Sequence, residues 1–107
     1  MAYAQQAALR TQETVIRLIA SSWTALEGST VLPRRFAVKV FNTGTAGASR
    51  VGLSYDSTLP NIKNSSHWLG AGQFVVEPAS TGLTLYGRAK LATGVNTIRV
   101  IVTEYGF

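Results

Sequence analysis

The clearest pattern in the chain is a regular alternation of apolar and polar residues over residues 34–42 (RRFAVKVFN). A period of two residues is typical of a β-strand whose two faces meet different surroundings. One face of this strand would carry Phe36, Val38 and Val40. The opposite face would carry Arg35, Ala37, Lys39 and Phe41.

Shorter segments with strand character follow, and residues rich in Gly, Pro, Asn and Ser separate them. They cover residues 49–55, 67–69, 73–77, 83–89 and 95–105. About seven short strands at regular spacing, joined by turns of this composition, indicate a sandwich or a barrel. We therefore expect an all-β protein with a single antiparallel β-sandwich of about seven strands.

The N-terminal segment differs from this body because residues 1–13 are small and polar, with Ala and Gln dominant. Residues 4–9 are long enough for one or two helical turns, although isolated helices of that length are marginal in water. We expect residues 1–13 to form an extended or partly helical arm that orders against a neighbouring subunit. Residues 14–107 would then form the sandwich domain.

Residues 14–20 (TVIRLIA) fit two interpretations. Their β-branched residues favour a strand, whereas Val15, Leu18 and Ile19 fall at helical spacing and would continue a helix from the arm. Periodicity alone leaves both open.

Charge is sparse: 14% of residues are charged, against about 25% in typical soluble domains, while 46% are hydrophobic. The formal net charge is +5, but the cations are scattered and Arg34–Arg35 is the one adjacent basic pair. Nucleic-acid binding needs clustered cations to neutralise phosphates, so we do not expect it. No apolar stretch approaches the ~18 residues of a membrane span, and the N-terminus lacks signal-peptide features. We expect no membrane association and synthesis in the cytoplasm.

Candidate chemistry is scarce. The chain has no cysteine, which excludes disulfides and thiolate sites. His67 is the single histidine, and five dispersed acids offer no paired motif or convergent ligand set. The Gly70-Ala71-Gly72 stretch precedes strand-like sequence rather than a helix, so it predicts a tight turn and not a phosphate loop. We expect no enzymatic activity, no metal and no cofactor.

The order of the segments resembles that of small β-sandwich virion proteins of tailed bacteriophages. The resemblance covers residues 33–104 and rests on turns and alternation. It is carried by residues 35–44 (RFAVKVFNTG), 51–58 (VGLSYDST), 69–73 (LGAGQ), 83–89 (LTLYGRA) and 98–104 (IRVIVTE). The chain departs from the pattern at Ala71, where proline is frequent, and its N-terminal third has no counterpart in the pattern.

This resemblance implies a virion structural protein, first of all a capsid cement or decoration protein that binds the major capsid protein and stabilises the head. A component of the neck, the tail or a fibre base is the alternative within that class. The chain would then reside in the virion as a homo-oligomer, with a trimer expected at a threefold capsid position. An alternative of another class is a carbohydrate-binding module that uses Trp68 and Tyr55.

Contacts with a partner protein are expected from the arm, from the polar face of the strand over 34–42, and from an aromatic residue that follows a polar loop. These expected interface residues are Tyr3, Gln5, Gln6, Leu9, Arg10, Arg35, Lys39, Phe41 and Trp68.

Overall fold

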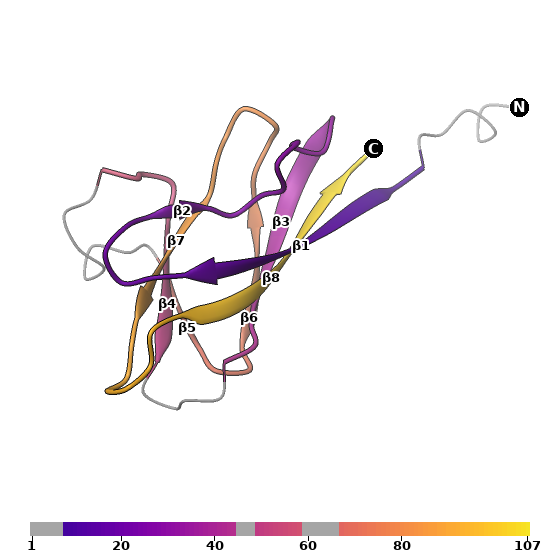
Figure 1. The fold of residues 1–107 in the computed structure, drawn as a ribbon. Helices are drawn as coiled ribbons and strands as arrows, with labels where there is room; N and C mark the ends of the chain where they lie inside the picture. Colours follow the sequence, from indigo (N-terminus) through magenta and orange to yellow (C-terminus); the bar gives the residue numbers. More distant parts are fainter. Residues whose placement is uncertain (1–7, 45–48, 59–66) are drawn as a thin grey trace, which may run out of the picture.

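The computed structural model describes residues 8–44, 49–58 and 67–107, which form eight β-strands and no helix (Figure 1). One sheet has the strand order β1-β8-β3-β6 and the other has the order β2-β7-β4-β5. All strand pairs are antiparallel. The expectation of an all-β protein with two antiparallel sheets is therefore confirmed, with eight strands rather than about seven. The strands are β1 (Arg10–Leu18), β2 (Thr24–Ala25), β3 (Arg35–Asn42), β4 (Arg50–Ser54), β5 (His67–Gly70), β6 (Phe74–Pro78), β7 (Tyr86–Lys90) and β8 (Ile98–Gly106).

The core contains apolar side chains from both sheets together with leucines from the connecting loops. Alternation along β3 and β8 supplies much of it, because every second residue of a strand points to the same face. The fully or almost fully buried members are Leu18, Leu26, Val38, Val40, Val51, Leu53, Leu69, Ala79, Leu85, Ala89, Ile98, Val100 and Val102. This core holds the two sheets face to face. In the first sheet the residues that point away from the core are exposed or half-buried, whereas in β4 of the second sheet residues 51–54 are all buried.

The N-terminal part of the chain resolves the question left open for residues 14–20. Residues 10–18 form β1, which pairs with β8 in an unbroken register from Arg10 opposite Gly106 to Leu18 opposite Ile98. Residues 10–13 thus belong to the sheet rather than to a separate arm, because β8 offers them a full row of backbone partners. The expected arm residues 1–7 lie outside the described residues.

A β-bulge changes the predicted faces of β3. Arg35 pairs with Gly106 and Ala37 pairs with Tyr105, so Phe36 is an extra residue between two successive positions of β8. One inserted residue reverses the side-chain alternation on one side of the bulge. Arg35 consequently shares the buried face with Val38, while Phe36 is 42% exposed and does not join that face as predicted. Its ring packs against Phe107, with 5.0 Å between the ring centroids.

The turn predicted at Gly70-Ala71-Gly72 is present and carries the chain from one sheet to the other. The Gln73 N–H donates to the Gly70 carbonyl at 3.1 Å, which closes a β-turn. Gly72 has a φ of 78° there, a left-handed conformation that glycine adopts without a Cβ penalty. The turn is tied to the end of β3 because the Gly72 N–H donates to the Asn42 carbonyl at 2.9 Å. It therefore places β6 at one edge of the first sheet.

Candidate functional site

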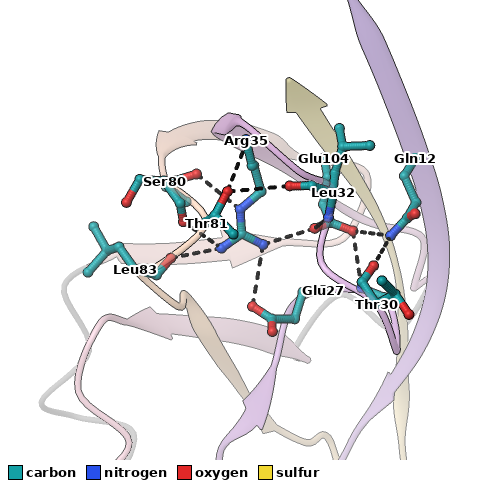
Figure 2. Close-up of polar contacts among 11 residues, drawn as sticks. Gln12, Glu27, Thr30, Leu32, Arg35, Ser80, Thr81, Leu83 and Glu104 are labelled. Carbon is teal, nitrogen blue, oxygen red and sulfur yellow. Dashed lines mark hydrogen bonds and ion pairs between the residues drawn. The ribbon is translucent and has the colours of Figure 1, made fainter. Parts of the chain in front are cut away.

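Two features of the described residues carry unusual side-chain arrangements: a buried polar cluster at one end of the sandwich and an apolar outer sheet face. The polar cluster centres on Arg35 of β3 and Glu104 of β8, whose side chains are both 0% exposed (Figure 2). Arg35 Nη1 donates to Glu104 Oε1 at 2.9 Å and to Glu27 Oε1 at 3.3 Å. A buried guanidinium thus stands between two carboxylates.

The remaining donors of Arg35 hold the loop over residues 79–83. Its Nε donates to the Ala79 carbonyl at 3.0 Å. Its Nη2 donates to the carbonyls of Ser80 at 2.9 Å and Leu83 at 2.8 Å (Figure 2). The planar guanidinium presents several N–H donors in a fixed fork, which suits this simultaneous contact with three carbonyls. Arg35 therefore fastens the connection between β6 and β7 to the end of β3.

The Glu104 carboxylate accepts four hydrogen bonds. Oε1 accepts from Arg35 and from the Leu32 N–H at 3.2 Å. Oε2 accepts from Gln12 Nε2 at 2.7 Å and from the Gly28 N–H at 3.1 Å. Burial by itself raises the pKa of Glu104, but these four donors stabilise the ionised form more strongly and hold the pKa below its usual value.

This cluster ties distant parts of the chain together. It joins β1, β3, β8 and two loops through groups that already satisfy one another. Within the described residues, no buried side-chain nitrogen or oxygen atom lacks a hydrogen-bond partner. Arg35 has no atom left for a partner protein, so the structure corrects the expectation that it lies at an interface: the bulge at Phe36 turns its side chain inward.

The second feature is the outer face of the β1-β8-β3-β6 sheet, hereafter the outer face. A row of apolar residues crosses all four strands at one level. Phe74 of β6 pairs with Phe41 of β3, Phe41 pairs with Ile101 of β8, and Ile101 pairs with Val15 of β1. The two ends of this apolar row, Phe74 and Val15, are 58% and 57% exposed. The outer face thus presents large apolar side chains where a solvated sheet face usually presents polar ones.

The next two sets of paired residues along these strands, on the same outer face, include both apolar and polar side chains. Val76, which is 52% exposed, lies opposite Lys39, and Lys39 lies opposite Thr103. The Lys39 ammonium stands 4.7 Å from the centroid of the Phe74 ring, a cation–π contact between neighbouring strands. Beyond them, Ala37 lies between Pro78 and Tyr105. The apolar surface therefore extends over several residues around the apolar row.

A shallow hollow of about 440 Å³ adjoins the outer face near the β5–β6 turn. Its lining residues are Trp68, Leu69, Gly72, Gln73 and Phe74. Phe74 belongs both to this hollow and to the apolar row, so the partly exposed Trp68 lies close to the β6 edge of the outer face. The hollow contains aromatic surface but no described acid or base.

Tyr55, the second aromatic of the carbohydrate-binding alternative, is engaged within the chain. Its hydroxyl donates to the Pro78 carbonyl at 2.7 Å and lies 3.5 Å from Glu77 Oε2. Partial burial and the nearby Glu77 carboxylate raise the pKa of the Tyr55 hydroxyl. Tyr55 is not among the residues that line the hollow beside Trp68.

The structure places the expected interface residues in different surroundings. Lys39 and Phe41 lie half-buried on the outer face, and Leu9 and Arg10 are exposed where β1 begins. Tyr3, Gln5 and Gln6 lie outside the described residues. The most exposed members of the outer face, Phe74, Val76 and Val15, did not emerge from the sequence. The alternation in β6 offered a signal, but it does not say which of the two faces is covered.

Among residues 8–44, 49–58 and 67–107, no group of three or more His, Cys, Asp or Glu side chains is arranged to hold a metal ion. The same residues include no helix long and apolar enough to cross a membrane.

Comparison with known proteins yields a likeness in fold. No protein-family model and no curated protein matches the sequence. A solved structure of a Bacillus endospore appendage, from a family of disulfide-linked pili, is similar, with a TM-score of 0.50 and 10% sequence identity. The match covers 94% of this chain and 89% of that chain. At this identity, the likeness concerns the arrangement of the strands alone.

Proposed function

We propose that this protein is a structural subunit of a bacteriophage virion that binds the major capsid protein through its outer face and thereby stabilises the head. The apolar row carries the proposal, since Phe74, Phe41, Ile101 and Val15 present apolar surface across all four strands. Contiguous exposed apolar patches of this kind mark protein-interaction sites. The order of turns and strands shared with tailed-phage sandwich proteins supports the virion as the setting.

The composition of the outer face fits a protein partner. Its aromatic and branched side chains surround one ammonium, that of Lys39, which is held against Phe74. Interface centres are typically apolar and aromatic with few charges. The charges of β1 and β8 that lie on this face, Glu13, Arg17 and Arg99, stand outside the row, as polar rims do.

The buried polar cluster has a supporting role in this proposal. It clamps two long loops and the ends of β1, β3 and β8, so the outer face is held by strands that cannot shift relative to one another without breaking buried ionic contacts. A preorganised surface loses less entropy when it binds.

The similar pilus is disulfide-linked, whereas this chain has no cysteine. Contacts with other virion proteins would therefore form without disulfide bonds and would depend on apolar burial. Such binding raises the melting temperature of both partners by mass action.

The test uses capsids that lack the protein, mixed with the purified chain. We expect co-sedimentation with the capsids and a higher capsid melting temperature. The double variant Phe74→Ser with Val76→Ser should weaken binding by about tenfold or more. Full burial of an apolar side chain contributes ~1.5–3 kcal/mol, about half of that remains available for each of these half-exposed residues, and a tenfold change corresponds to ~1.4 kcal/mol.

The matched control is Leu83→Ser, which removes another apolar side chain, 42% exposed, from a loop outside the outer face. Both variants should keep the fold, because exposed substitutions alter stability by about 0.5 kcal/mol or less. Absence of binding by the wild type would overturn the capsid assignment. Equal binding by the Phe74/Val76 variant and the wild type would overturn the role of the outer face.

Copy number separates this proposal from the neck, tail or fibre-base alternative. A capsid subunit is present in many copies over the whole shell, whereas a neck or tail component is present in a few copies at one vertex. Quantitative mass spectrometry of purified particles, with the major capsid protein as the internal standard, distinguishes the two.

A further inference from the structure

The β1 edge of the first sheet is the longest unpaired strand edge among the described residues. β1 has nine residues, while the other edge strands, β6, β5 and β2, have five, four and two. One side of β1 pairs with β8 along its whole length, and no described strand pairs with the other side (Figure 1). An open edge of this length is a template for a further strand.

Natural edge strands are usually protected by short length, charged side chains, proline, bulges or inward-pointing charges. β1 contains no proline, and its register with β8 has no bulge. Among its inward-pointing polar residues, Gln12 is held by Glu104 and by the Thr30 carbonyl. By contrast, β6 ends in Pro78, which cannot donate a backbone hydrogen bond. Of the usual protecting devices, β1 has only charged side chains, namely Arg10, Glu13 and Arg17.

The outward-facing residues of β1 form a symmetric charge pattern. Glu13 and Arg17 are exposed on the outer face, two positions before and two positions after Val15. Neither makes an ion pair with another described residue. Opposite charges that face each other across two strands are stabilising, whereas like charges are destabilising.

We propose that two copies of this chain pair antiparallel along their β1 edges about a two-fold axis at Val15. Val15 then lies opposite Val15 of the other copy, and Glu13 of each copy lies opposite Arg17 of the other. Because residues directly opposite in an antiparallel pair share a face, both ion pairs form on the outer face. The interface is self-complementary, as a two-fold contact requires.

Two-fold axes at the neighbouring residues of β1 pair the charges less favourably. An axis at Glu13 sets two carboxylates opposite each other, and an axis at Arg17 does the same with two guanidinium groups. An axis at Thr14 or Ile16 leaves both charges opposite uncharged residues. Of the five axes from Glu13 to Arg17, the one at Val15 alone matches both charges.

The same axis joins the apolar rows of the two copies. The row ends at Val15, so pairing about that residue continues it directly into the row of the second copy. The pair would present one wide apolar surface across both four-stranded sheets. A closed pair of this kind differs from the trimer expected from a threefold capsid position. It does not depend on the proposed capsid binding, because dimerisation is measured with the chain alone.

A cysteine cross-link tests the axis, since the chain has no native cysteine. Val15→Cys should form a covalent dimer under mild oxidation. Opposite Cβ atoms in paired strands lie ~4.5–5.5 Å apart, and a small movement of the two edge strands brings them to the ~3.5–4.5 Å that a disulfide spans. The matched control is Val76→Cys, which is similarly exposed but lies on the β6 edge strand of the same sheet. Equal or faster cross-linking of the Val76→Cys variant would overturn the proposal.

Charge reversal tests the register by sedimentation over a range of concentrations. Arg17→Glu and Glu13→Arg should each weaken dimerisation by about tenfold or more, and the double variant should return to within about threefold of the wild type. Arg50→Glu, on the other sheet, makes the same charge change as Arg17→Glu and should have no effect. A monomeric wild type, a trimer, an open filament, or a double variant that is not restored would each overturn the two-fold pair.

Discussion

Replacement of Glu104 by glutamine removes one buried charge at almost constant side-chain volume. In the wild type, each carboxylate oxygen accepts two hydrogen bonds, Oε1 from Arg35 and Leu32 and Oε2 from Gln12 and Gly28. A glutamine amide keeps one acceptor oxygen and places an NH₂ group at the other site. In either orientation, that NH₂ group faces two donors, and Arg35 loses the closer of its two carboxylate partners.

The expected loss in the free energy of unfolding is about 3–5 kcal/mol, the range for removal of one partner from a buried ion pair. The two donors left without an acceptor cost about 1–3 kcal/mol each when fully buried, which accounts for much of that range. A domain of this size has a total stability of about 5–15 kcal/mol. Glu104→Gln should therefore remove a large share of it.

Urea unfolding, followed by tryptophan fluorescence and circular dichroism, measures this loss. With a slope of about 1–2 kcal/mol per molar urea, the midpoint should fall by about 1.5 M or more. The matched control is Glu27→Gln, because Glu27 accepts one longer bond from Arg35, 3.3 Å, and its side chain is 18% exposed. We expect a loss of about 1 kcal/mol for this control, because the glutamine Oε1 still accepts the hydrogen bond from Arg35. A Glu104→Gln loss no larger than that of Glu27→Gln would refute the assignment of Glu104 as the centre of the cluster.

Three further outcomes are expected. Because the pKa of Glu104 in the folded state lies below its usual value of 4.5, the ionised carboxylate stabilises the fold above pH 4.5, and this stabilisation is lost as the pH falls. The difference in the free energy of unfolding between the wild type and Glu104→Gln should therefore narrow in urea titrations at lower pH. A constant difference would contradict this. Gly106→Ala should cost about 1–3 kcal/mol in thermal unfolding, since its Cβ would lie 3.0 Å from two backbone carbonyl oxygens, whereas Gly82→Ala meets nothing within 4 Å and should be nearly neutral. Arg17→Glu should stabilise the dilute monomer by about 0.2–1 kcal/mol because Arg17 lies directly opposite Arg99; a lower melting temperature would contradict that register.

The local pattern of apolar, polar and turn-forming residues determined much of the secondary structure. Alternation over 34–42, together with Gly- and Pro-containing turns, was enough to predict an all-β protein with two antiparallel sheets, because side-chain period and turn chemistry are properties of neighbouring residues. The turn at Gly70-Ala71-Gly72 was predictable for the same reason. Residues 14–18 were not, since their apolar spacing fits both a strand and a helix, and only pairing with β8 selects the strand.

Part of the buried polar cluster can be predicted from the sequence. Glu104 follows Val100 and Val102 at a spacing of two, which puts a carboxylate on the buried face of β8. The ion-pair partner of Glu104, Arg35, cannot be predicted in this way. Arg35 reaches it from 69 positions away, and only because the bulge at Phe36 turns the guanidinium inward.

The outer face shows most clearly what the tertiary structure decides. By itself, the sequence determined that apolar and polar residues would alternate along the strands, that no thiol chemistry is available, and that charged residues would be sparse. It did not determine that Phe74, Phe41, Ile101 and Val15 would stand in one row, because they belong to strands that become neighbours only in the order β1-β8-β3-β6. Which face of a strand is covered, and what lies beside it, depends on long-range pairing and register, and these arise when the two sheets pack around a common core.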